Sequence, residues 1–335
     1  MNTAVPCSGV PGLFFKPGSP VHGTKTIRIG TRGSALAIAQ AGEVKRMLEK
    51  KHKNLRFELV PIKTFGDEYQ SVEIFKRTNI GVFTKAIEKS LLLGKVDLAI
   101  HSLKDLPTTI PGKLILAAIP KRSDTRDVLI SRGGFTLKTL PKNAKIGTGS
   151  PRRKRQILRL RPDLNVVDLR GNLETRVSHV LKQKSLDAIV IAHAGLLRLK
   201  KFRRYSKIIS EKDILPAVGQ GALAIEARKE DREVLKIVRS IRHIATEKKV
   251  LAERIFLKTL QGGCRVPVGV LTKEKKNIFY MKAAVFSVNS SEVIEGEITS
   301  PAPDALSSAK KLARRLLTKG AAQFLKEARA GESSQ

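Results

Sequence analysis

Hydrophobic and polar residues follow one another along the chain in blocks that predict short buried strands, each followed by an amphipathic helix. In the first block, the apolar residues of the helix at 36–51 recur mainly along one side. The expected order is a strand at 27–29, a glycine turn at 30–34, a helix at 36–51, a strand at 57–62, a helix at 83–93 and a strand at 96–100. Short strands alternating with helices indicate a parallel sheet with crossover helices.

The same pattern then repeats. The second block predicts a strand at 144–146, a turn at 147–150, a helix at 151–160, a strand at 166–169, a helix at 172–181 and a strand at 188–192. Ser150 suits the N-cap of its helix and Pro151 the first helical position. The tripeptide Ile-Gly-Thr stands at the matching strand ends, at 29–31 and 146–148. We therefore expect two similarly built α/β lobes that face a shared cleft.

The last third of the chain has a different pattern. After 216–221 come a charged helical region at 231–249, a helix that ends near 260, strands at 279–286 and 293–298, and a helix at 305–317. This order predicts a small α+β domain. Residues 1–24 hold several Pro and Gly but no acidic residue and no Arg. They are more typical of an irregular extension than of a targeting signal.

The charge of the chain is strongly positive. Its 335 residues include 64 Lys and Arg against 30 Asp and Glu, which gives a formal net charge of +34. Such a charge suggests a polyanionic partner, namely nucleic acid, an anionic membrane or an acidic substrate, although a solvated charged surface is the plain alternative. Aromatic residues make up only 4% of the chain, which argues against stacking on single-stranded nucleic acid. Two cysteines exclude a disulfide framework and suggest a reducing compartment.

Basic residues gather at the second glycine turn. Both turns open helices, where backbone N–H groups favour an oxyanion. Thr148 and Ser150 are followed directly by Arg152 and Arg153, at a strand–helix junction of the kind where open sheets bind ligands. We expect an anion site here rather than a solvated face, with Arg170 and Arg176 following on the next strand end and helix. The later basic run at 198–204 is predicted to be a solvated face, except for Arg198.

Two further residues are candidates for chemistry. Asp105 follows a buried strand and stands beside Lys104, so it should stay ionised and could stabilise a cationic intermediate. Cys264 follows two glycines and precedes Arg265, which should favour the thiolate. Taken alone, an aspartate in a loop and an inert cysteine are the simpler interpretations. The histidines are scattered without ligand spacing, so we predict no metal site.

Six segments, in this order, resemble the porphobilinogen deaminase family, also called hydroxymethylbilane synthase. They are Ile-Gly-Thr-Arg-Gly-Ser at 29–34, His-Ser-Leu-Lys-Asp-Leu-Pro at 101–107, Gly-Thr-Gly-Ser-Pro-Arg-Arg at 147–153, Leu-Arg-Gly-Asn at 169–172, Leu-Pro-Ala-Val-Gly-Gln-Gly-Ala at 215–222 and Gly-Gly-Cys-Arg-Val-Pro at 262–267. The chain departs from the family at Gly149, where bacterial relatives often have Ser, and at Ile80, where many have a basic residue.

The resemblance implies an α/β fold with two similar doubly wound lobes, like those of periplasmic binding proteins, and a small C-terminal α+β domain. The implied domains are an extension at 1–24, lobe one at 25–120 and 220–240, lobe two at 124–216 and the third domain at 244–330. It also implies a dipyrromethane cofactor bound through a thioether to Cys264. Starting from this primer, the enzyme joins four porphobilinogen molecules head to tail, releases ammonia each time and frees the linear tetrapyrrole hydroxymethylbilane.

The resemblance gives the basic residues a chemical reason, because each added porphobilinogen brings an acetate and a propionate. It implies Asp105 as the catalytic residue and a binding set of Arg32, Ser34, Ser102, Lys104, Thr148, Ser150, Arg152, Arg153, Arg170, Arg176, Arg198 and Gln220. We expect a monomer in the cytoplasm, or in an organelle if 1–24 is a targeting remnant, without nucleic acid or membrane as partner. The alternatives are a non-catalytic anion-binding module of the same fold and a basic nucleic-acid-binding protein.

Overall fold

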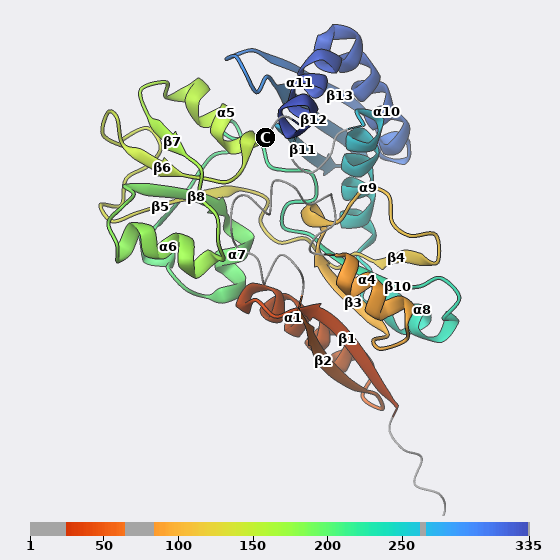
Figure 1. Ribbon diagram of the computed structural model, residues 1–335. Coiled ribbons are helices and arrows are strands. Elements are labelled where there is room, and N and C mark those ends of the chain that lie inside the picture. The colour runs from red at the N-terminus through yellow and green to blue at the C-terminus, as the bar shows by residue number, and fades with distance from the viewer. Residues whose placement is uncertain (1–24, 64–83, 262–265, 334–335) are drawn as a thin grey trace, which may run out of the picture.

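The computed structural model describes residues 25–63, 84–261 and 266–333, and it contains three sheets (Figure 1). Two are five-stranded and each forms the centre of a lobe, while the third has three strands and belongs to the C-terminal region. The predicted α/β fold with two similar lobes and a small C-terminal α+β domain is confirmed. The domain limits themselves stay a prediction.

The first lobe has the strand order β2-β1-β3-β10-β4. Its strands are β1 (Thr26–Arg32), β2 (Arg56–Ile62), β3 (Leu98–Ser102), β4 (Leu114–Ala118) and β10 (Leu223–Arg228), and its helices are α1 (Ala35–Lys51), α4 (Lys85–Leu92) and α8 (Arg232–Arg239). β1 runs parallel to β2 and β3, but β10 runs antiparallel to both β3 and β4. The predicted parallel arrangement therefore holds for β1, β2 and β3, whereas β10, a strand returning from the second lobe, is inserted antiparallel into the sheet.

The second lobe has the strand order β7-β6-β8-β5-β9. Its strands are β5 (Asp127–Ser131), β6 (Lys145–Gly147), β7 (Asn165–Val167), β8 (Ala188–Ala192) and β9 (Ser206–Ile208), and its helices are α5 (Pro151–Leu160), α6 (Leu173–Leu181) and α7 (His193–Leu199). β6 is parallel to β7 and β8, whereas β5 is antiparallel to β8 and β9. The two lobes thus match strand for strand, with one antiparallel strand in the same place.

Local sequence explains where the helices of the lobes begin. The Ser34 hydroxyl accepts the Ala37 N–H at the start of α1, and the Asn172 side chain accepts the Thr175 N–H at the start of α6. Pro151 occupies the first turn of α5 as predicted, but the side chain of Ser150 makes no capping bond there. The predicted turn at 30–34 is shorter than expected, because Gly30, Thr31 and Arg32 continue β1 and pair with β2.

Two segments, at 119–126 and 209–222, carry the chain between the lobes. They meet at Gly221, whose φ of +85° is in the region that favours glycine. A β-carbon there would lie 2.7 Å from the carbonyl oxygen of Ser123, and the Ser123 N–H donates to the Gly221 carbonyl over 3.2 Å. A larger residue at 221 would push the two crossing segments apart.

The C-terminal domain is an antiparallel sheet, β11-β12-β13, covered by helices. Its elements are α9 (Ile244–Thr259), β11 (Val268–Lys275), β12 (Ile278–Phe286), β13 (Val293–Pro301), α10 (Ala305–Leu316) and α11 (Ala322–Ser333). Sequence patterns did not predict β11 or α11, and the charged helical region at 231–249 contains all of α8 and the first part of α9. Among the described residues, no helix is long and apolar enough to span a bilayer.

Candidate active site

Asp105 lies where β3 ends. The chain leaves this buried strand in a single 3₁₀ turn, Leu103–Asp105, which is anchored by the buried Leu103 and by a bond from the Leu103 N–H to the Ala222 carbonyl. The Asp105 side chain is exposed and the neighbouring Lys104 is half-buried. A carboxylate is thereby held at the carboxyl end of a strand, the edge at which open α/β sheets bind ligands.

Arg152 and Arg153 lie at the start of α5 in a buried ion-pair network with Asp127. Each guanidinium donates to one Asp127 carboxylate oxygen over 2.8 Å, and the side chain of Gln220 donates to Asp127 over 2.9 Å. The two arginines are only 3% and 5% exposed. Burial alone would raise the pKa of Asp127, but the two guanidinium groups lower it to about 2.

Sequence reasoning predicted both arginines and Gln220 for the site but missed Asp127. The only local signal is that a carboxylate stands at the first position of β5, before three apolar residues. This signal does not indicate which residues pair with Asp127. Asp127 is therefore the main addition that the structure makes to this part of the site.

Other cations surround Asp105. Burial lowers the pKa of Lys104 to about 8, Asp105 opposes this effect, and the positive charges of Arg153 and Arg152 add to it. Burial likewise lowers the pKa of Arg176 to about 10, together with repulsion from Arg153 and Arg170. Arg170 itself is exposed. We call this group the Asp105 cluster, and its members are Lys104, Asp105, Asp127, Arg152, Arg153, Arg170 and Arg176. The cations of the cluster outnumber its carboxylates.

The predicted hydroxyl groups of Ser34, Ser102 and Thr148 have local partners. Ser102 exchanges hydrogen bonds with Gln40 of α1, at 2.8 and 3.2 Å. The Thr148 hydroxyl accepts the Ser150 N–H over 3.3 Å, and Ser34 caps α1. The Ser102 bonds hold the end of β3 beside α1, and the Thr148 bond holds the end of β6 at the start of α5.

Arg32 and Arg198 stand apart from the Asp127 network. Arg32 is half-buried at the end of β1. Arg198, on α7 of the second lobe, donates from Nε to the Glu43 carboxylate on α1 of the first lobe over 2.7 Å. Sequence reasoning gave no sign of Glu43, because the two residues are far apart in the chain.

Gly149 has a steric reason in this structure. A β-carbon there would lie 2.7 Å from the carbonyl oxygen of Leu169. Cys264, the expected attachment point of the cofactor, and Ile80, the other departure from the family, lie outside the described residues. Among the residues that are described, no group of three or more His, Cys, Asp and Glu could hold a metal ion.

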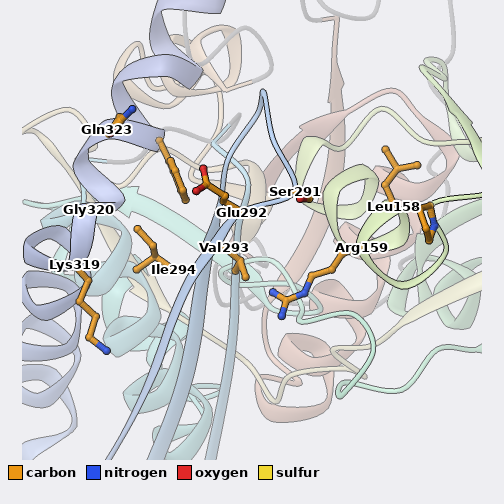
Figure 2. Close-up of a pocket in the computed structure, with 11 residues that line it drawn as sticks. Leu158, Arg159, Ser291, Glu292, Val293, Ile294, Lys319, Gly320 and Gln323 are labelled. Atoms are coloured by element: carbon orange, nitrogen blue, oxygen red, sulfur yellow. The ribbon is translucent and has the colours of Figure 1, made fainter.

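A groove of about 910 Å³ lies at the other end of α5, between this helix and the C-terminal domain (Figure 2). Arg159 of α5 extends toward Val293 of β13, and Lys319 lies on the far side. None of the residues that line the groove belongs to the Asp105 cluster. The groove is thus distinct from the candidate active site.

Comparison with known families gives matches over most of the chain. The family description "Porphobilinogen deaminase, dipyromethane cofactor binding domain" matches residues 27–236, and "Porphobilinogen deaminase, C-terminal domain" matches residues 248–318. A porphobilinogen deaminase of Desulforudis audaxviator is 43% identical over 309 residues, covering 92% of this chain and 99% of the relative. One from Syntrophomonas wolfei is 42% identical over 305 residues, covering 91% and 99%.

Solved structures with similar lobes are more distant. The effector-binding domain of BenM with benzoate is 16% identical, covers 67% of this chain and 93% of its own, and has a TM-score of 0.39. The L-cystine solute receptor of Neisseria gonorrhoeae is 14% identical, covers 75% and 100%, and has a TM-score of 0.37. Both scores are low, so the fold assignment depends on the sheet topology itself.

Proposed function

Because the chain belongs to the porphobilinogen deaminase family, we propose a role for each residue of its candidate site. The enzyme is a transferase that deaminates porphobilinogen and joins four molecules into hydroxymethylbilane on a dipyrromethane primer. Asp105 is the catalytic carboxylate and Cys264 is the attachment point of the primer. The side chains that bind the cofactor and the substrate are Arg32, Ser34, Ser102, Lys104, Thr148, Ser150, Arg152, Arg153, Arg170, Arg176, Arg198 and Gln220.

The observation that carries this proposal is the excess of positive charge around Asp105. Lys104 and Arg176 are desolvated and lie near other cations, and both effects lower their pKa values. Anionic groups placed among them would relieve this repulsion, with charge-assisted hydrogen bonds that contribute about 1.5–3 kcal/mol each. A ligand with several carboxylates therefore fits the cluster.

The dipyrromethane satisfies that requirement. When bound, it supplies acetate and propionate carboxylates for the cluster and the pyrrole carbon to which the first substrate is joined. Arg152 and Arg153 would hold its carboxylates from the start of α5, with the hydroxyl groups of Thr148 and Ser150 beside them. Asp127 keeps both guanidinium groups in place by pairing with each of them, and the side chain of Gln220 donates in turn to Asp127.

Asp105 acts on the substrate. Loss of ammonia from porphobilinogen, driven by the pyrrole nitrogen, leaves a cationic electrophile. The exposed Asp105 carboxylate can accept the pyrrole N–H, stabilise that positive charge and assist proton transfer.

The test is the intact mass of the denatured protein. We expect an adduct of two porphobilinogen units less ammonia, and we expect Cys264→Ser to lack it. Cys7→Ser is the matched control, since it removes the other cysteine of the chain and should keep the adduct. A fully active protein without adduct would contradict the proposal, and so would an adduct that follows Cys7.

We also propose that the enzyme works as a monomer in the cytoplasm, without nucleic acid. Support for the cytoplasm comes from the bacterial relatives. Size-exclusion chromatography with light scattering at physiological salt would measure the mass in solution. A dimer mass that persists on dilution would refute the monomer.

A further inference from the structure

Arg198 joins the two lobes. Its Nε donates to Glu43 Oε2 over 2.7 Å, and its Nη2 donates to the Gly221 carbonyl over 3.1 Å. Its side chain is 7% exposed and that of Glu43 28% exposed, so the pair is largely shielded from water. α7 of the second lobe lies beside α1 of the first (Figure 1). One guanidinium is thus held by the first lobe and by a crossing segment, although it belongs to the second lobe.

The α1 residues that make these contacts lie on one face of the helix. Leu36, Gln40 and Glu43 have the spacing i, i+4, i+7, which places them on one face of the helix. Leu36 faces Gly195 of α7, where a β-carbon would lie 3.7 Å from Leu36 Cδ2. Gln40 bonds Ser102 at the end of β3. One face of α1 therefore contacts both α7 and the strand that leads to Asp105.

The geometry restricts how Arg198 can turn. A guanidinium is planar, and bonds at Nε and at Nη2 fix both the plane and its rotation. The Gly221 carbonyl also accepts the Ser123 N–H, so the same oxygen ties Arg198 to the point where the crossing segments meet. A change in the angle between the lobes would move the groups that hold Arg198.

We propose that Glu43 is a positioning residue, which fixes the Arg198 guanidinium for a substrate carboxylate and makes this recognition depend on how the two lobes are arranged. The inference rests on the proposed function, in which Arg198 binds the substrate. Glu43 does not touch the reacting atoms and acts through Arg198. If it instead competed with the substrate for the guanidinium, its removal would strengthen binding.

The kinetic test compares Glu43→Gln with Glu49→Gln. Glu49 is on the same helix and pairs within that helix with Lys45 over 3.7 Å, so it controls for loss of a charge on α1. We expect Glu43→Gln to raise the KM for porphobilinogen about tenfold with kcat nearly unchanged, as for loss of one coupled pair. Glu49→Gln should leave both constants unchanged. An unchanged or lower KM in Glu43→Gln would overturn the positioning role.

A double-mutant cycle tests whether Glu43 acts through Arg198. In an Arg198→Gln background, Glu43→Gln should have no further effect on KM, because there is no guanidinium left to position. Independent, additive effects of the two substitutions would show that Glu43 acts elsewhere and would refute the inference.

Hydrogen exchange provides a readout without turnover. In the unliganded protein, Glu43→Gln should speed amide exchange across α7, while Glu49→Gln should not. Equal exchange in Glu43→Gln and the unsubstituted protein would overturn the coupling between lobes. If the unsubstituted enzyme failed to consume porphobilinogen, the proposed function would fail, and the exchange experiment would still decide whether Glu43 holds α7.

Discussion

The two lobes have the same strand order but place their buried carboxylates differently. In the second lobe, Asp127 pairs with Ala192 at the carboxyl end of β8, where it meets Arg152 and Arg153. In the first lobe, Glu226 of the equivalent strand pairs with Ala99 within β3 and contacts His101 at 2.8 Å, away from the end of the strand. The buried acidic side chain thus lies at the ligand-binding edge of the sheet in the second lobe and inside the sheet in the first.

The residues that follow β3 in the first lobe and β8 in the second also differ. β3 ends in the 3₁₀ turn with the exposed Asp105, whereas β8 leads directly into α7. The first lobe therefore presents a carboxylate and the second lobe presents guanidinium groups. This difference matches the proposed roles, in which the second lobe would hold acidic groups and the first would act on the reacting centre.

The largest expected effect comes from removing the carboxylate of the first lobe. Asp105→Asn should lower kcat by about 10²–10⁴-fold, as for loss of a general acid–base group, while the melting temperature stays unchanged. Steady-state kinetics and circular dichroism would measure these. Asp168→Asn is the control, since Asp168 is an exposed aspartate after β7 of the other lobe. Near-normal turnover in Asp105→Asn would remove this residue from catalysis and favour a non-catalytic anion-binding module.

The next effect concerns the stability of the second lobe. Asp127→Asn leaves two buried guanidinium groups without their counter-charge, which should lower the free energy of unfolding by about 3–5 kcal/mol. Urea denaturation would measure it. Asp163→Asn breaks the half-buried pair with Arg161 on the same lobe and should change stability far less. Equal losses in the two variants would show that burial does not distinguish these pairs.

The smallest effect is a pH dependence of opposite sign in the two lobes. The pKa of Asp127 is lowered to about 2, so its contribution is present above its unfolded pKa of about 3.9 and is lost as pH falls toward 2. Burial raises the pKa of Glu88 on α4, and Glu226 adds to this rise. Glu88 therefore favours the folded state increasingly as pH falls through its raised pKa.

Denaturation curves between pH 2 and pH 6 would separate the two groups. Asp127→Asn should remove part of the loss of stability at acid pH, and Glu88→Gln should steepen that loss by removing the opposing contribution. Parallel pH profiles for both variants would contradict the assigned directions.

Features determined by neighbouring residues could be predicted from the sequence. Pro151 begins a helix because its fixed φ suits the first turn, and the end of a buried strand places Asp105 at the edge of a sheet. Gly-Thr at 147–148 and the residues after it form the strand–turn–helix that the pattern predicts.

Features that depend on residues far apart in the chain could not be predicted from the sequence. The pairing of Asp127 with Arg152 and of Glu43 with Arg198 joins residues 25 and 155 positions apart. No local periodicity encodes such pairs. The resemblance assigned residues 220–240 to lobe one, but no pattern placed β10 between β3 and β4, because its apolar run is compatible with several sheet neighbours.

The position of β10 has a consequence for biosynthesis. All five strands of the second sheet lie within residues 127–208, so that sheet can close as soon as its own segment has left the ribosome. The first sheet begins at residue 26 but needs residues 223–228 at its interior before β4 can be joined to β3. The lobe made first should therefore be completed only after the second lobe, and its unpaired strand edges stay open to aggregation or chaperone binding for most of translation.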